Sequence, residues 1–257
     1  MGPEGKIQSV CDVFAAAPAG GTVVPAHVNF DTWVVVPTFN EGPVVGAVLK
    51  ELLSWFPNVV AVDDGSSDNS ATEIVGSGAR LVRHPINLGA GAAMESGLQF
   101  ALLDPMARYF VTFDADGQHR VEDAVAMVAK LRNGEHDILL GSRFMGASLG
   151  MPRSRRLMLH AARIFETLSS GVSLTDAHNG LRAFNRIFAE KVRFRMRDMA
   201  HASEMLRLIR STGVRWAEQP VTILYTDYSR GKGQRSINSV NIAVDVWLNH
   251  LLEERKR

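Results

Sequence analysis

The sequence has little cysteine, almost no net charge and no long apolar run, and each shortage excludes a class of protein. Among its 257 residues Cys11 is the only cysteine, so the chain cannot form an internal disulfide and suits a reducing compartment. The formal net charge of +1 argues against a broad basic surface, and we expect no nucleic-acid partner. No apolar run approaches the roughly 20 residues that span a bilayer. The first residues also lack the basic-then-apolar order of a secretory signal.

From Trp33 onward the sequence shows a regular alternation of short apolar runs with amphipathic stretches. This alternation is typical of βα units, and it predicts an α/β fold with a mostly parallel sheet. The chain is long enough to bury a substantial core. The predicted strands are residues 33–37, 58–64, 79–84, 109–116 and 137–143, and the predicted helices include residues 44–56, 89–103 and 121–132.

Polar residues and glycines stand at the end of every one of these predicted strands or just after it. The residues concerned are Pro37, Asn40, Glu41, Asp63, Asp64, Ser66, Asn87, Gly89, Gly91, Asp114, Asp116, Gly141, Ser142 and Arg143. A single polar strand end is usually just a turn. In an open parallel sheet, however, ligands bind beyond the carboxyl ends of the strands, so a repeated pattern of this kind collects at one edge. The repetition therefore predicts a binding site there.

The fourth predicted strand ends in two acids, Asp114 and Asp116, with Gln118 shortly after them. Extended chain directs alternate side chains to the same face, so the two carboxylates repel each other unless a cation lies between them. Oxygen ligands of this kind suit Mg²⁺ or Mn²⁺, whereas zinc would require more cysteine and histidine than His119 supplies. A glycoside-hydrolase pair needs carboxylates about 5–10 Å apart across a sugar, and acids on one strand end are cramped for that role. We therefore predict a divalent cation site.

Two phosphate-binding motifs can be weighed in the same way. The P-loop pattern is absent from the sequence. Residues 87–97 place a Gly-x-Gly at the start of a predicted helix, but this follows the third strand and lacks the third glycine of a dinucleotide fingerprint. A tight strand-to-helix turn explains this stretch as well as a phosphate contact does.

An ordered set of motifs resembles the family 2 glycosyltransferases. The set covers about Thr32 to Ser236 and consists of "VVVPTFNE", "VDDGSSDNS", "NLGAGAA", "FDADGQH", "GSRF" and "DAHNGLRAF". It is most similar to the branch of dolichyl- and polyprenyl-phosphate mannosyl- and glucosyltransferases. The resemblance implies a GT-A fold, a Rossmann-like and mostly parallel sheet with helices on both faces. It also implies an enzyme that binds a UDP-, GDP- or dTDP-linked sugar across the strand ends, with Mg²⁺ or Mn²⁺ bridging the diphosphate at a DXD motif.

The resemblance further implies roles for individual residues of this chain. The residues implied to line the nucleotide-sugar pocket are Pro37, Phe39, Glu41, Asp63, Asp64, Asp114, Ala115 and Asp116. The implied metal ligands are Asp114, Asp116 and Gln118, the implied phosphate contacts are Arg143, Arg230 and Arg235, and the implied catalytic set is Asp114, Asp116 and Arg143. Phe39 stands where the branch more usually has tyrosine. Ser236 stands where it usually has lysine, so Arg235 or Lys232 is expected to supply that charge.

These assignments predict an inverting sugar transfer, and the nature of the acceptor decides whether a base is needed. A polyprenyl phosphate, the acceptor that we expect, is already ionised at neutral pH and needs none. A hydroxyl of a glycan or lipid-linked glycan, as in surface polysaccharide synthesis, would need Asp176 or Glu204 as base. Two other classes are the rivals. A nucleotidyltransferase would want a glycine-rich basic loop where "PTFNEG" stands, and an inactive nucleotide-sugar-binding module would not need intact acids.

The domain boundaries follow from the same patterns. Residues 1–30 form a predicted N-terminal extension, residues 31–236 the glycosyltransferase domain and residues 237–257 a C-terminal amphipathic helix. A second apolar stripe of helical period follows the basic segment "MPRSRR" and comprises Leu157, Ala161, Ile164, Phe165 and Leu168. Such helices usually cover a core, but basic flanks also suit a membrane surface. The resemblance favours the surface, so we expect a peripheral protein at the cytoplasmic face of the membrane.

Overall fold

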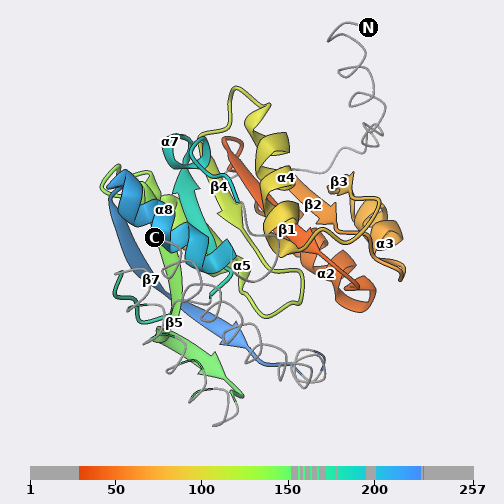
Figure 1. The fold of residues 1–257 in the computed structure, drawn as a ribbon. Coiled ribbons are helices and arrows are strands. Elements are labelled where there is room, and N and C mark those ends of the chain that lie inside the picture. Colours follow the sequence, from red (N-terminus) through yellow and green to blue (C-terminus); the bar gives the residue numbers. More distant parts are fainter. Residues whose placement is uncertain are drawn as a thin grey trace, which may run out of the picture.

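The computed structural model describes residues 29–151, 172–176, 179–194, 201–226 and 228, together with the single residues 156, 159, 163 and 167 (Figure 1). Several predictions concern residues outside this part of the chain. They are the extension up to residue 28, the apolar stripe that follows "MPRSRR", the phosphate contacts Arg230 and Arg235, and the helix 237–257.

A seven-stranded sheet with the order β3-β2-β1-β4-β6-β5-β7 forms the centre of the described structure. Its strands are β1 (Thr32–Thr38), β2 (Asn58–Asp63), β3 (Arg80–Arg83), β4 (Tyr109–Thr112), β5 (Ile138–Leu149), β6 (Arg182–Asn185) and β7 (Trp216–Leu224). All neighbouring strands run parallel except β6, which lies antiparallel between β4 and β5. The prediction of a mostly parallel α/β sheet is therefore confirmed.

Helices cover both faces of this sheet, as the resemblance implied. They are α2 (Gly42–Leu53), α3 (Ser70–Ser77), α4 (Ala90–Leu102), α5 (Val121–Leu131), α7 (Arg186–Ala189) and α8 (His201–Thr212). Alternate residues of β1 explain the two layers, because Val34 and Val36 enter the core formed with α2, α3 and α5. Trp33 and Val35 enter the core formed with α4, α7 and α8 on the opposite face. None of the described helices is both long and apolar enough to cross a membrane.

The close approach of α4 to the sheet depends on a glycine. An added Cβ on Gly97 would stand 2.3 Å from Val35 Cγ1 and 3.0 Å from Val62 Cγ2. Any side chain at this position would therefore push the helix away from a closely packed core. Since α4 begins at Ala90, its position also determines where the preceding loop lies beyond the strand ends.

The structure differs from the sequence interpretation mainly in the second half of the sheet. The sequence pattern ends the fifth strand at Arg143, but β5 continues to Leu149. Its extension pairs with β7 after a register shift between Ser142 and Ala147, so residues 141–143 lie in the middle of a strand instead of at its end. The sequence pattern also gave no strand at β6, because its four residues, Arg182–Asn185, make too short a run to show a period.

Candidate active site

The second acid after β2, Asp64, is bound by the backbone of the protein itself. It is 2% exposed, and it accepts the backbone N–H of Leu88 on Oδ1 at 2.9 Å and that of Gly89 on Oδ2 at 2.8 Å. His84 Nδ1 lies 2.7 Å from the same Oδ1, and His84 Nε2 lies 2.9 Å from Ser96 Oγ. Asp64 therefore ties the loop before α4 to the end of β2.

Its neighbour Asp63 is fully buried and has one oxygen in a different situation. Oδ1 accepts the backbone N–H of Ser66 at 2.9 Å. Oδ2 lies 3.0 Å from Arg83 Nε as an ion pair, but it has no hydrogen-bond partner among the described residues. Arg83 borders a cavity of about 370 Å³ that is lined by Gly65, Ser66, Arg83, His84 and Pro85. A carboxylate oxygen and a guanidinium side by side can bind a ligand edge that both donates and accepts hydrogen bonds.

The end of β1 is held against the segment that follows β2. Asn40 adopts a left-handed backbone conformation with φ of 53°, and its N–H donates to Ser66 Oγ at 2.9 Å. Gly42, the first residue of α2, donates its N–H to Asp68 Oδ2 at 3.0 Å. An added Cβ on Gly42 would stand 2.0 Å from Asn69 Oδ1, so this approach requires glycine. The two strand ends therefore form one joined wall of the site.

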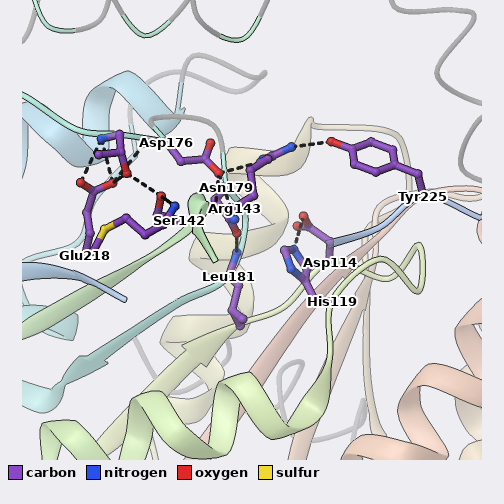
Figure 2. Close-up of polar contacts among 11 residues, drawn as sticks. Asp114, His119, Ser142, Arg143, Asp176, Asn179, Leu181, Glu218 and Tyr225 are labelled. Atoms are coloured by element: carbon purple, nitrogen blue, oxygen red, sulfur yellow. Dashed lines mark hydrogen bonds and ion pairs between the residues drawn. The ribbon is translucent and has the colours of Figure 1, made fainter. Parts of the chain in front are cut away.

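Asp114 and Asp116 lie beyond the carboxyl end of β4 in a less favourable environment. The Asp114 side chain is 48% exposed, and its Oδ2 lies 3.0 Å from His119 Nε2 (Figure 2). Burial, followed by the charge of Asp114, raises the pKa of Asp116 to about 6. The backbone N–H of Gln118 donates to Asp116 Oδ1 at 3.0 Å. This bond lowers the pKa of Asp116, but by less than burial and the charge of Asp114 raise it. A cation between the two acids would relieve this repulsion.

The backbone of Gly180 lies directly against the carboxylate of Asp114. An added Cβ on Gly180 would stand 2.1 Å from Asp114 Oδ2 and 2.3 Å from Oδ1. Thr112 Oγ1 donates to the carbonyl oxygen of Gly180 at 2.7 Å, which joins this segment to β4. The glycine in the motif "DAHNGLRAF" is thus explained by its contact with the first acid of "FDADGQH".

These residues fit a divalent cation of the Mg²⁺ or Mn²⁺ type. Asp114 and Asp116 offer carboxylate oxygens, and burial, together with the negative charge of Asp114, raises the pKa of Asp116. In the part of the chain that the structure describes, no group of three or more His, Cys, Asp or Glu is arranged to hold a metal ion. Mg²⁺ commonly takes only one or two protein carboxylates and completes its shell with water and phosphate oxygens. A site of this kind therefore suits a cation that is shared with a phosphate-bearing ligand.

Arg143 lies on β5 and is held from two sides (Figure 2). It is 6% exposed, and Asp176 Oδ2 accepts both its Nε–H at 2.6 Å and its backbone N–H at 3.0 Å. Its Nη1 donates to Tyr225 Oη at 2.9 Å. Burial alone would lower the pKa of Arg143, but the charge of Asp176 and the contact with Tyr225 together raise it. A fixed buried guanidinium at this edge suits an anionic ligand.

The segment that carries Asp176 is anchored by Glu218, a residue of β7 that the sequence interpretation did not single out. Glu218 Oε1 accepts the hydroxyl of Thr175 at 2.8 Å and the backbone N–H groups of Thr175 at 2.9 Å and Asp176 at 3.1 Å. Thr175 Oγ1 lies 2.5 Å from Ser142 Oγ on β5, and Asn179 Nδ2 donates to Asp176 Oδ2 at 3.3 Å. Figure 2 shows this network beside Arg143. Its function is to keep Asp176, and through it Arg143, in one position.

The chain after β7 returns to the end of β1. Tyr228 Oη donates to Glu41 Oε2 at 2.8 Å, a contact between residues 187 positions apart. Burial raises the pKa of Tyr228, and the hydrogen bond to Glu41 and the charges of Glu41, Asp68 and Asp116 raise it further. The hydroxyl therefore stays protonated, and Tyr228 lies close to the acids at the ends of β1 and β4.

The structure places most of the predicted site residues at this one edge of the sheet. Pro37 lies in β1, Phe39 follows the strand and is 43% exposed, and Ala115 is 3% exposed between the two acids. Glu204 lies half-buried in the first turn of α8. Residues to which the sequence interpretation gave no role, but which the structure places in or near the site, are His119, Arg182, Glu218, Tyr225 and Tyr228. His119 and Arg182 lie in the motifs "FDADGQH" and "DAHNGLRAF", and the partner of His119 is near in sequence. The partners of Glu218, Tyr225 and Tyr228 are distant in sequence.

Comparison with curated proteins identifies relatives over most of the chain. An uncharacterised protein of Methanocaldococcus jannaschii is 33% identical over 217 residues, which cover 82% of this chain and 89% of the relative. UDP-N-acetylglucosamine–dolichyl-phosphate N-acetylglucosaminyltransferase of Methanococcus voltae is 27% identical over 225 residues, which cover 78% of this chain and 88% of the relative.

The fold is also found among solved structures. The crystal structure of glucosyl-3-phosphoglycerate synthase from Mycobacterium tuberculosis in complex with Mn²⁺ and UDP-glucose matches with a TM-score of 0.61 at 18% sequence identity. The match covers 76% of this chain and 70% of that chain, and it confirms the expected GT-A fold. Residues 33–193 match the family model described as Glycosyl transferase family 2. Because that match extends over more than half of the sequence, this chain is a glycosyltransferase and belongs to glycosyl transferase family 2.

Proposed function

We propose that this enzyme transfers a sugar, with inversion, from a nucleotide-sugar donor to a polyprenyl phosphate at the cytoplasmic face of a membrane, using Mg²⁺ or Mn²⁺. The observation that carries the proposal is that acidic and basic side chains lie at the same edge of the sheet. The acids Asp114 and Asp116 lie beyond β4, and the buried Arg143 lies on β5. The acids suit the cation that accompanies a diphosphate, and the arginine suits an anionic acceptor.

For the donor, we infer that the nucleoside binds at the ends of β1 and β2, where Pro37, Phe39 and Glu41 lie. Asp63 is better placed than Asp64 to bind the nucleobase of the donor, because Asp63 Oδ2 has no hydrogen-bond partner among the described residues. Asp64 is already bound by Leu88, Gly89 and His84. The neighbouring M. tuberculosis structure, which contains UDP-glucose and Mn²⁺, supports a nucleotide-sugar as the class of donor.

For the reaction, we propose that Asp114 and Asp116 hold the divalent cation, with Gln118 as a further ligand. When bound, the cation neutralises charge on the departing nucleoside diphosphate. His119 keeps Asp114 in place through its ring nitrogen, at 3.0 Å from Oδ2. Arg143, with the predicted contacts Arg230 and Arg235, orients the acceptor phosphate. A phosphate oxygen then attacks the anomeric carbon as the bond to the diphosphate breaks on the opposite face.

The geometry supports a phosphate acceptor more than a hydroxyl acceptor. Asp176 is 4% exposed, and its Oδ2 already accepts the backbone N–H and Nε–H of Arg143 and the Nδ2–H of Asn179. A carboxylate in this state is poorly placed to remove a proton from an incoming hydroxyl. The relative from M. voltae is named for transfer to dolichyl phosphate, which also supports a lipid phosphate. Transfer to a hydroxyl, with Glu204 as base, is the alternative.

The test is a sugar-transfer assay with matched acceptors. The full chain is incubated with radiolabelled UDP-, GDP- or dTDP-sugars and Mn²⁺, together with a polyprenyl phosphate or the corresponding polyprenol in the same detergent. We expect label to enter the lipid only with the phosphate, and to be lost when EDTA removes the metal. Transfer to a hydroxyl but not to the lipid phosphate would refute the proposed acceptor.

One variant separates the two acceptors further. We expect Glu204→Ala to keep most of the transfer to polyprenyl phosphate, because that reaction needs no base. If Glu204→Ala abolished turnover while Mn²⁺-dependent UDP binding survived, a base would be needed and the hydroxyl reaction would be favoured.

A further inference from the structure

Arg182, the first residue of β6, is a buried cation that has no part in the reaction proposed above. It is 4% exposed, and its Nη1 is buried without a hydrogen-bond partner among the described residues. A charged group with an unsatisfied nitrogen in the interior is costly unless opposite charges lie near it. The position of Arg182 therefore needs an explanation.

The register of β6 places Arg182 between the two halves of the site. It lies opposite Thr112 of β4 and opposite Leu140 of β5. The segment that leads into it contacts acids on both sides. The backbone of Gly180 lies against the Asp114 carboxylate, and Asn179 donates to Asp176.

The charges around Arg182 match its position. Burial lowers the pKa of Arg182, and the negative charges of Asp114 and Asp176 oppose that effect. Because arginine begins far above neutral pH, it stays protonated here. Asp176 is in turn paired with Arg143, so the charges alternate in sign from Asp114 through Arg182 and Asp176 to Arg143.

We propose that Arg182 is a positioning residue, an internal counter-cation that balances the charges of Asp114 and Asp176 before a metal ion or a phosphate binds. This inference rests on the proposed function in so far as Asp114 is taken as a metal ligand. A permanent positive charge near Asp114 weakens the attraction of the site for a free divalent cation. The cation therefore binds well only together with the negative charge of the donor diphosphate.

The first test measures Mn²⁺ binding without nucleotide, from the electron paramagnetic resonance signal of free Mn²⁺. We expect Arg182→Met to bind Mn²⁺ about tenfold more tightly than the wild type, since roughly 1.4 kcal/mol of repulsion corresponds to that factor. Arg182→Lys keeps the charge and should stay close to the wild type. Arg215→Met removes a cation next to Asp137, at the opposite end of the sheet, and should leave the affinity unchanged. Unchanged or weaker binding by Arg182→Met, or an equal gain in Arg215→Met, would overturn the proposal.

The second test needs no metal and stands independently of the proposed function. Urea unfolding in EDTA is compared for the wild type, Arg182→Met, Asp114→Asn and the double variant. We expect the double variant to be more stable than the sum of the two single effects, because the opposite charges are removed together. Purely additive effects would overturn the proposal. If Arg182→Met does not fold, the double variant should still do so, and its failure would also count against Arg182 as a counter-cation.

The two tests also separate this inference from the proposed function. If the wild type binds no Mn²⁺ even with UDP present, the metal site of the proposed function is wrong. The unfolding comparison in EDTA would still decide whether Arg182 and Asp114 are coupled.

Discussion

Two pairs of neighbouring acids lie on either side of β1, at the ends of β2 and β4, and they differ in burial and in hydrogen bonding. Asp63 and Asp64 are 0% and 2% exposed, and backbone N–H groups of the following loops bind them. Asp114 and Asp116 are partly exposed, and the pKa of Asp116 is raised to about 6 by burial and by its neighbour. Both pairs stand at the end of a strand, so this position does not explain why they differ. The difference lies in their surroundings: the buried Asp64 accepts two backbone N–H groups, whereas the charge of Asp114 adds to burial in raising the pKa of Asp116.

The largest expected effect comes from Asp116→Asn. The substitution removes one negative charge from the predicted cation site, so we expect sugar transfer to fall about 10³-fold, the scale typical for losing one charge-stabilising group. Stability in EDTA should not decrease, because the repulsion with Asp114 is relieved. Transfer assays and thermal unfolding measure the two effects. A variant that keeps more than about a tenth of the activity, or that unfolds more easily, would contradict this assignment.

The same chemical change at Asp64 should have the opposite result. Asp64→Asn weakens the bonds to Leu88, Gly89 and His84 in a buried place, so we expect the free energy of unfolding to fall by about 3 kcal/mol. The folded variant should keep turnover within a few-fold of the wild type. Urea unfolding and the transfer assay measure both quantities. If stability were unchanged and donor affinity collapsed, Asp64 would be a donor contact and not an anchor.

The first half of the sheet and the acids at its edge could be predicted from the sequence. Strands β1 to β4 alternate with amphipathic helices at short intervals, and each strand places polar residues at the same edge. The difference between Asp64 and Asp116 could not be predicted in this way. The donors that bind Asp64 lie 24 and 25 residues further along the chain, and only the folded loop brings them to the carboxylate.

The second half of the site shows the same limit more strongly. Arg143 could be found from its motif, but its partners Asp176 and Tyr225 lie 33 and 82 residues away. Glu218 and Arg182 lie on β7 and β6, strands for which the sequence has no clear period. Their importance comes from burial and from the charges around them, which are properties of the tertiary structure. A sequence pattern therefore reveals the residues that meet a ligand sooner than the residues that hold them.

A change at Tyr225 tests whether Arg143, like the acids, depends on the hydrogen bonds that hold its side chain. Tyr225→Phe removes the hydroxyl that accepts from Arg143 Nη1 but leaves the ring in its buried place. We expect the KM for polyprenyl phosphate to rise about tenfold, the effect of one hydrogen bond to a charged group, with little change in donor affinity. Tyr109→Phe, at the beginning of β4 and away from the site, is the control and should leave both unchanged. An equal rise in both variants would show that Tyr225 acts only through stability.

The smallest expected effect concerns Asp137, an acid at the opposite end of the sheet whose carboxylate accepts hydrogen bonds from the protein. Arg215 donates to it from its side chain and backbone, and these bonds hold the pKa of Asp137 at about 2 instead of 3.8. A lowered pKa stabilises the folded state above about pH 4, and this stabilisation is lost as the pH falls from about 4 towards 2.

The Arg215 side chain is 59% exposed, so water and salt weaken the pair and the effect stays modest. We expect Asp137→Asn to lower the melting temperature by about 3 °C at pH 7, with the difference from wild type closing as the pH falls below 4. Glu122→Gln, which changes an exposed pair with Arg120, should show no difference at any pH. A difference that stayed constant on acidification would mean that the charge of Asp137 is not what stabilises the fold. In that case the stabilisation of an acid by hydrogen bonds from the chain would hold for Asp64 but not for this end of the sheet.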